Sequence, residues 1–430
     1  MGAVMRTFGV SPEVRARRAE VLDRMYGASS NGGGSVGHRR RQPRRRSAAA
    51  SPARRREDLG PASMVYFAII VVVSFFVVLG LVMVLSATSA SRVGGETSPY
   101  GEFQRQVTWA AIGLVAMSIA MKVPYQRLRR YVLPLSVLTA GTMLLPLVPG
   151  VGVTINGATS WVRIGPVGFQ PSEFAKLASI AFLADFFARH RDRVHQPAHG
   201  IIPLMLVIGY TTGVSFYQGD LGSALVLGAV IMAVGLVGAV PFMHLVTLGS
   251  SGVLAVVIAV WSEPRRFERI TAYRDVEGNK EDLAWQSWQG LVSIANGGMT
   301  GSGIGGSNSK LGYLPLAHSD FIFAVIADEL GFIGSVAVVG GFAALVTLGI
   351  QTALAAPDRF GALLAGGIAV WFGVQAFVNL GGVANLIPLT GLTLPFFSAG
   401  GTSLVVSMIA AGLLLNVARR AVTTSDRSRR

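Results

Sequence analysis

Three side chains, His318, Ser319 and Asp320, end a long polar and glycine-containing stretch and stand directly before an apolar segment. A carboxylate and an imidazole at such a boundary could move protons as a general base or acid, or bind a divalent cation. The plainer alternative is that Asp320 caps the following helix, because an acidic side chain satisfies free amide groups at a helix start. From these residues alone both interpretations stay open.

A second polar group lies in the sequence Gln170-Pro-Ser172-Glu173-Phe-Ala-Lys176. Proline favours the first helical turn, so a helix should begin at Pro171 and carry Ser172 and Glu173 in its first turn. The free amides and positive dipole end of that turn could face an anion, and Lys176 lies one turn on, on the face of Glu173. A capped helix start with a snorkelling lysine explains the same pattern.

Three further acidic residues border or enter apolar segments: Asp220, Asp328 and Glu329. For Asp220 a turn at the segment boundary is an almost equally good explanation. Ionisable groups inside a membrane span are costly and are functional candidates by default. Adjacent helical side chains point about 100° apart, so Asp328 and Glu329 cannot face one cavity equally.

The glycines of residues 301–306 match G-x-G-x-x-G literally, but no strand precedes them and no alternation of strands and helices surrounds them. This context argues against dinucleotide binding, and Ser309-Lys310 lacks the order of a phosphate-binding loop. We interpret this stretch as flexible backbone near a ligand, with Lys310 as a candidate cation.

Composition excludes an ordinary soluble protein: of 430 residues, 51% are hydrophobic and 14% charged, and the mean hydropathy is +0.53. Such values are typical of a polytopic membrane protein. The chain contains no cysteine, which removes disulfides and thiolate metal sites.

Because unpaired backbone groups are costly in lipid, long apolar runs should be helices. The sequence thus predicts an all-α fold with ten transmembrane helices. They fall at 64–87, 107–123, 131–147, 174–187, 201–216, 221–240 and 242–261, with three more beginning near Phe321, Gly361 and Thr402.

Charge predicts the orientation. Residues 1–58 hold 14 arginines against five acidic residues, and further basic clusters at 122–130, 189–193 and 419–420 fall on the same side. By the positive-inside rule both termini are cytoplasmic, and residues 262–320 form a large extracytoplasmic loop between helices seven and eight. A loop of that size without evident regular structure is usually functional or disordered, and its tryptophans argue against disorder.

Three parts of the chain follow: a disordered basic tail at 1–60, a membrane domain at 61–420 and a short cytoplasmic tail at 421–430. The arginine triplets of the first tail favour a topology signal with contact to anionic membrane lipids, or a protein-docking arm. Nothing aromatic or structured there supports nucleic-acid binding.

Four motifs in order resemble the FtsW/RodA family, also called SEDS (shape, elongation, division and sporulation), over roughly residues 64–420. They are Phe169-Gln-Pro-Ser-Glu-Phe-Ala-Lys-Leu, Asp220-Leu-Gly, Ala317-His-Ser-Asp-Phe-Ile-Phe-Ala-Val-Ile-Ala-Asp-Glu-Leu-Gly and Pro388-Leu-Thr-Gly-Leu-Thr-Leu-Pro-Phe-Phe-Ser-Ala-Gly-Gly-Thr-Ser.

The resemblance implies a peptidoglycan glycosyltransferase with ten transmembrane helices that polymerises lipid II outside the inner (cytoplasmic) membrane. Its partners would be lipid II, the nascent glycan strand, a class B penicillin-binding transpeptidase, membrane lipids and other division proteins. It makes Asp320 the catalytic residue. Implied substrate-binding residues are Trp161, Arg163, Gln170, Ser172, Glu173, Lys176, Lys310, His318, Ser319, Ser398 and Gly400.

Two positions depart from the family pattern. Many members carry a basic residue just before the tryptophan matched by Trp161, where this chain has Thr159-Ser160 and places Arg163 afterwards. Many have tyrosine at the position of Ala399, a change that occurs in the division branch. This favours a role in cell division over a role in elongation.

The implied reaction joins an α-linked glycosyl pyrophosphate to a sugar hydroxyl through a β-1,4 bond, so a single displacement with one base suffices. Asp320 would take the hydroxyl proton, and His318 would orient it or bind a divalent cation such as Mg or Mn. Lys176, Arg163 or Lys310 could stabilise the leaving undecaprenyl pyrophosphate. The alternatives are a transporter or lipid II flippase, and a non-catalytic division scaffold.

Overall fold

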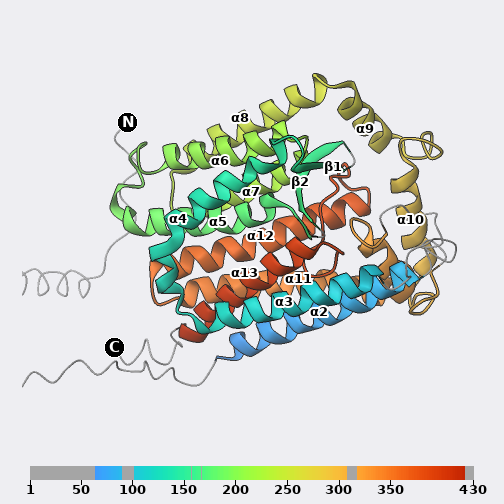
Figure 1. Ribbon diagram of the computed structural model, residues 1–430, viewed down its shortest axis with the longest axis horizontal. Coiled ribbons are helices and arrows are strands. Elements are labelled where there is room, and N and C mark those ends of the chain that lie inside the picture. Colours follow the sequence, from blue (N-terminus) through green and yellow to red (C-terminus); the bar gives the residue numbers. More distant parts are fainter. Residues whose placement is uncertain (1–62, 90–100, 156, 166, 308–316, 422–430) are drawn as a thin grey trace, which may run out of the picture. The chain divides into compact units, whose positions relative to one another are not determined.

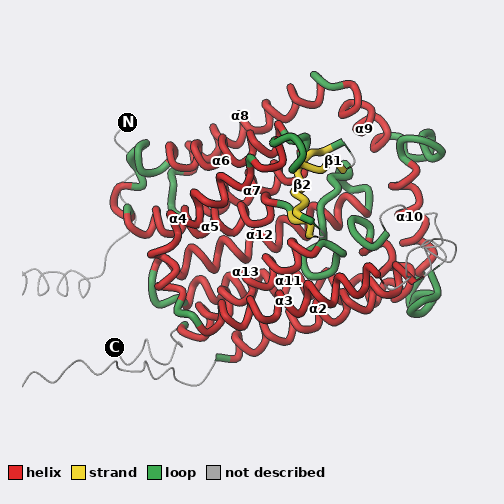
Figure 2. Tube along the Cα trace, viewed as in Figure 1, coloured by secondary structure: helices red, strands yellow, loops and turns green. Residues whose placement is uncertain are grey.

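The computed structural model describes residues 63–89, 101–155, 157–165, 167–307 and 317–421. The predicted tail at 1–60, the candidate cation Lys310 and all but the first residue of the predicted tail at 421–430 lie outside the described residues. The described part is mostly helical, and Figures 1 and 2 show its helices lying side by side.

Ten of the helices coincide with the ten apolar segments predicted from the sequence. They are α2 (Met64–Ser89), α3 (Gly101–Lys122), α4 (Tyr125–Met143), α5 (Pro171–Arg189), α6 (Ile201–Tyr217), α7 (Leu221–Val237), α8 (Phe242–Trp261), α11 (Ile322–Ala355), α12 (Arg359–Val383) and α13 (Gly401–Arg420). By length and composition, six helices of the described part could cross a membrane: α2, α4, α8, α11, α12 and α13. Two shorter apolar helices, α6 and α7, accompany them.

The all-α prediction needs one correction, because a small antiparallel sheet follows α4 and the short 3-10 turn η1 (Leu145–Leu147). Its strands are β1 (Gly152–Ile155), β2 (Ala158–Ile164) and β3 (Val167–Phe169), in that order. Ser160 and Val162 of β2 are buried and stand two residues apart, so they lie on one face of the strand, and Gly157 takes the positive φ of 84° that its tight hairpin turn requires. The predicted polar interfacial segment is thus a folded platform.

The large segment 262–320 also holds regular structure that the sequence reasoning missed: α9 (Pro264–Arg274) and α10 (Trp285–Gly297). Pro264 stands in the first turn of α9, where its missing amide proton costs nothing. Figure 1 shows both helices at the right-hand end of the helix bundle, and β1 and β2 lie in the same half of the picture.

One helix is broken within its apolar sequence. Within α11, Gly331 has a non-helical φ of 67°, a conformation open mainly to glycine. The loop after α10 pairs with the break: Ser302 N–H donates to the Asp328 carbonyl at 2.9 Å, and Phe332 N–H donates to the Gly298 carbonyl at 2.9 Å. Protein therefore supplies the partners that lipid cannot.

The core lies around α12 and α13. In the most apolar stretch of α13, 89% of residues are buried, against 17% for α8 at the edge. The central helices are thus enclosed by other helices, so polar side chains on them face protein and not lipid.

Candidate functional site

Asp320 lies in the turn that leads into α11, half-buried and next to the buried Phe321. The helix begins at Ile322, with Phe321 as the cap residue and without a side-chain cap. The alternative that Asp320 only caps this helix is therefore wrong. Its carboxylate does not cap the helix and can therefore contact a substrate.

The turn is held by hydrogen bonds from two sides. The Asn379 side-chain amide on α12 donates to the Asp320 carbonyl at 3.0 Å and to the Leu392 carbonyl at 2.7 Å. From the other side, the Ser398 hydroxyl donates to the Ser319 carbonyl at 2.7 Å, and Ala399 N–H donates to the His318 carbonyl at 2.8 Å. The main chain around Asp320 is thereby fixed.

Residues 384–400, the proline- and glycine-containing segment between α12 and α13, form one wall of the site. A β-carbon built on Gly391 would lie 3.5 Å from Asp320 Oδ2, and Gly391 itself has a φ of 68°. A side chain at this position would be strained by the backbone and would stand in van der Waals contact with the carboxylate. The main chain of this segment therefore lies close beside Asp320.

A second acid faces the same region. Asp220 caps α7 by accepting from Ser223 N–H at 2.9 Å, and its other oxygen accepts from the Gln170 side chain at 2.9 Å. Burial raises the pKa of Asp320 from 3.8 to about 7; Ser319 lowers it by hydrogen bonding, and the negative charge of Asp220 raises it further. A carboxyl group with a pKa near neutral is suited to accept a proton at physiological pH.

The predicted anion-binding helix start is buried. Lys176 is 1% exposed, and its Nζ donates to Glu173 Oε1 at 2.8 Å and to Gln375 Oε1 at 2.7 Å. The ammonium also lies 5.2 Å from the ring centroid of Trp371. Ser172 bonds Ser223 at 3.3 Å inside the protein. This polar cluster of α5 and α12 is closed in the structure.

The closed cluster is nevertheless joined to the wall beside Asp320. The Gln375 side chain donates to the Thr393 carbonyl at 2.9 Å, and the Thr393 hydroxyl lies 2.9 Å from that of Ser403 on α13. Gly400, which stands before α13, accepts from Leu404 N–H at 2.9 Å. Ser398 and Gly400 thus shape the wall through local hydrogen bonds.

The small sheet places its candidates nearer the surface. Arg163 is exposed on β2 opposite Gly168, and Trp161 is half-buried. Thr159 N–H donates to the Gln218 carbonyl at 2.8 Å, which seats β2 beside the turn that carries Asp220. Of the predicted cations, Arg163 is exposed, Lys176 is enclosed and Lys310 is outside the described residues.

Metal binding by His318 finds no support in the described residues. Nowhere in them do three His, Asp or Glu side chains gather closely enough to hold an ion.

The two acids inside α11 have separate surroundings. Glu329 accepts from the Ser86 hydroxyl of α2 at 2.6 and 2.8 Å, and Asp328 accepts from the Ser307 hydroxyl at 2.5 Å. The hydroxyl partners of the two acids therefore come from different parts of the chain. Both brace the break at Gly331 against its neighbours.

Sequence reasoning missed the two amides of α12. Gln375 and Asn379 are buried and stand four residues apart, so they lie on one face of the helix. The sequence could have revealed them, because two amides at this spacing inside an apolar segment indicate a polar contact with another part of the protein.

Replacing Asn379 by alanine should lower catalysis. The change leaves the Asp320 and Leu392 carbonyls unpaired at a cost of about 1–3 kcal/mol, and it releases the turn that aims Asp320. We expect about a tenfold or larger loss in the rate per folded molecule. Asn416 is the matched control, because its buried amide donates to the carbonyls of Ala120 and Met121 away from Asp320. Equal rate losses for Asn379→Ala and Asn416→Ala would contradict this role.

Comparison with known proteins agrees with this architecture. The family model described as "Cell cycle protein", FTSW_RODA_SPOVE, matches residues 66–423. The chain is 38% identical over 341 residues to the "Probable peptidoglycan glycosyltransferase FtsW" of Geobacter sp. (strain M18), covering 79% of this chain and 93% of that one. It is 37% identical to the "Stage V sporulation protein E" of Bacillus subtilis (strain 168), covering 80% and 94%.

Two solved structures share the fold. One is described under "Structural coordination of polymerization and crosslinking by a peptidoglycan synthase complex", with a TM-score of 0.66, 31% identity and coverage of 82% of this chain and 97% of that one. The other is the rod shape determining protein RodA of Thermus thermophilus, with a TM-score of 0.61, 30% identity and coverage of 83% and 97%. From the matched family model and these relatives, the chain belongs to the FtsW/RodA/SpoVE family.

Proposed function

We propose that this protein is a peptidoglycan glycosyltransferase of cell division that polymerises lipid II, with Asp320 as its general base. Its membership of the family and the names of its relatives support the glycosyltransferase activity. The observation that carries the choice of base is the half-buried Asp320, whose pKa is raised to about 7 and whose carboxylate lies beside the main chain of Gly391.

The proton transfer follows from the site. Asp320 accepts the proton of the acceptor sugar hydroxyl as that oxygen attacks the anomeric carbon of the donor. The bond from that carbon to the pyrophosphate breaks, and the configuration inverts in one displacement. Asn379 and Ser398 hold the main chain on either side of Asp320, so the carboxylate is positioned before substrate arrives.

The leaving undecaprenyl pyrophosphate needs positive charge. Arg163 is exposed on β2 and is the cation best able to reach it in this conformation. Lys176 is committed to Glu173 and Gln375, so it supports the site from within unless the cluster opens. The predicted substrate contacts of Trp161, Gln170, His318 and Ser319 remain part of this proposal.

The proposal includes the topology predicted from charge. Ten spans formed by α2–α8 and α11–α13 would place both termini in the cytoplasm and Asp320 on the outer face of the inner membrane. The basic tail at 1–60, the membrane domain at 61–420 and the short tail at 421–430 would be its three parts.

A class B penicillin-binding transpeptidase is the proposed partner. One structural neighbour comes from a peptidoglycan synthase complex that coordinates polymerisation and crosslinking, which supports such a pairing. Lipid II and the growing glycan strand are the proposed substrates, and other division proteins and membrane lipids complete the partners.

The polymerisation rate should depend on pH through Asp320. A base must be ionised, so the rate should fall about tenfold for each pH unit below about 7 and level off above it. In Asp220→Asn the negative charge is lost while the helix cap remains. The pKa of Asp320 should then fall, and half-maximal rate should move to lower pH. An unchanged profile in Asp220→Asn would contradict the electrostatic coupling.

The rival functions are separated by one experiment on purified protein in sealed vesicles with labelled lipid II. Protein-dependent polymer supports the proposed glycosyltransferase. Lipid II that crosses the bilayer without formation of polymer would instead identify a flippase. If an active partner transpeptidase is present and neither polymer nor transport is observed, the result would favour a scaffold.

A further inference from the structure

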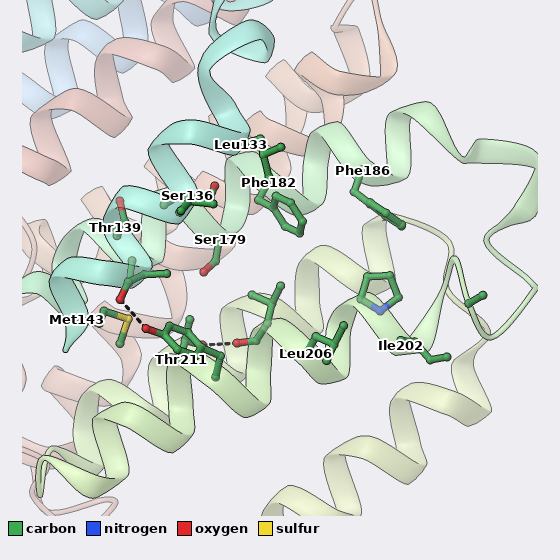
Figure 3. Close-up of a pocket in the computed structure, with 18 residues that line it drawn as sticks. Leu133, Ser136, Thr139, Met143, Ser179, Phe182, Phe186, Ile202, Leu206 and Thr211 are labelled. Atoms are coloured by element: carbon green, nitrogen blue, oxygen red, sulfur yellow. Dashed lines mark hydrogen bonds between the residues drawn. The ribbon is translucent and has the colours of Figure 1, made fainter.

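An apolar cavity of about 470 Å³ lies between α4, α5 and α6, apart from the Asp320 site. Figure 3 shows side chains of the three helices lining it, among them Leu133 of α4, Phe182 of α5 and Leu206 of α6. Its few polar side chains are hydroxyls. A cavity of this lining between membrane helices is filled most favourably by hydrocarbon, since water finds few partners there.

The cavity is closed at one end. The Tyr210 hydroxyl of α6 donates to the Ala140 carbonyl of α4 at 2.5 Å, and the Gln218 side chain donates to the Met143 carbonyl at 2.5 Å. These bonds tie α4 to α6 at the end where Gln218 leads into Asp220. A hydrocarbon chain cannot pass there without breaking them.

The other half faces the membrane. Leu133 and Leu206, on opposite walls, are 62% and 67% exposed, and Ile202 at the far end is 44% exposed. The cavity is therefore reached from the bilayer between α4 and α6. Its mouth lies toward the end of α5 that carries Arg189, about 27 Å along the helix from Pro171.

Positive charge gathers at that mouth. Arg129 and Arg189 share one carboxylate, Asp185, at 2.7 and 2.8 Å, so the group keeps a net positive charge. The connection from α5 to α6 adds the exposed Arg191 and Arg193 with one exposed acid, Asp192, between them, so the mouth keeps a net positive charge. The same connection supplies Ala198 to the cavity lining, so the charges and the cavity belong to one place.

We propose that this cavity binds one acyl chain of an anionic phospholipid, whose phosphate lies against the arginines of residues 189–193. Basic clusters beside grooves between membrane helices recognise such headgroups. The polyprenyl chain of a substrate held at Asp320 fits less well, because it would meet the closed end of the cavity. The lipid would fasten α4, α5 and α6 together.

Charge should set the affinity. A chain that leaves the bilayer for the cavity gains little, because lipid tails are as apolar as the lining. Each arginine near an anionic headgroup contributes about 1 kcal/mol, which corresponds to about a fivefold change in affinity. The cavity fixes the position of the lipid, and the arginines provide selectivity for an anionic headgroup.

The test is native mass spectrometry of the intact protein with phosphatidylglycerol, phosphatidylcholine or undecaprenyl phosphate added to the detergent. The wild type should retain one phosphatidylglycerol in preference to the other two. Ala140→Phe and Ala178→Phe fill the cavity from α4 and from α5 and should each abolish that adduct. Gly141→Phe is the matched control, because a side chain there points into open space.

The arginines give an independent readout. Arg191→Gln with Arg193→Gln should weaken phosphatidylglycerol binding by about 25-fold, the product of two fivefold factors, without reducing phosphatidylcholine binding. Undiminished binding in this variant, or in a cavity-filled variant with an unchanged melting temperature, overturns the proposal. Preferential retention of undecaprenyl phosphate overturns it as well and assigns the cavity to a polyprenyl chain.

Discussion

Replacing Asp320 by asparagine should lower the rate of glycan polymerisation by about 10²- to 10⁴-fold, the usual contribution of a positioned general base. Asparagine keeps the shape of the side chain but cannot accept the hydroxyl proton. The main-chain bonds from Asn379 and Ser398 do not involve the carboxylate, so the turn should keep its structure. The rate of polymer formation from labelled lipid II measures the loss.

Two controls separate chemistry from folding in this variant. The melting temperature of Asp320→Asn in detergent should equal or exceed that of the wild type, because an ionised carboxylate is no longer buried. Asp320→Glu keeps the carboxylate but moves it by one methylene group, so it should retain more activity than asparagine while remaining well below the wild type.

Replacing Lys176 by methionine should destabilise the protein by about 3–5 kcal/mol, because it leaves Glu173 charged, buried and without its partner. Both side chains of the pair are at most 3% exposed, so solvent cannot compensate. The Gln375 oxygen would keep only the Trp371 N–H, at 2.6 Å. Thermal unfolding in detergent, followed by loss of the folded species, measures the effect.

The double variant Lys176→Met with Glu173→Gln is the matched comparison. It removes both charges, so most of the lost stability should return. If the double variant were as unstable as Lys176→Met alone, the ion pair would not be the cause. If it regained stability without activity, Lys176 would have a role in polymerisation beyond support of the fold.

Much of the fold was predictable because lipid imposes a simple rule. Each long apolar run must satisfy its own backbone groups, so all ten runs are helices. The small sheet escaped prediction since its strands are only three to seven residues long, and their pairing depends on the turn at Gly157. The helices α9 and α10 escaped because their sequences contain only short apolar stretches between glycines and charges.

The site was predictable in its residues but not in its contacts. The spacing of Glu173 and Lys176 placed both on one helical face, as the structure confirms. Nothing local revealed that α12 covers that face, because Gln375 lies 199 residues from Lys176 along the chain. For the same reason the support of Asp320 by Asn379 became visible only in three dimensions.

The most direct test of the account is the amount of glycan polymer that purified Asp320→Asn makes from labelled lipid II beside its transpeptidase partner, relative to the wild type. The account predicts abundant polymer from the wild type and about one hundredth or less from the variant. Undiminished polymer from a correctly folded Asp320→Asn protein would contradict the assignment of Asp320 as the base.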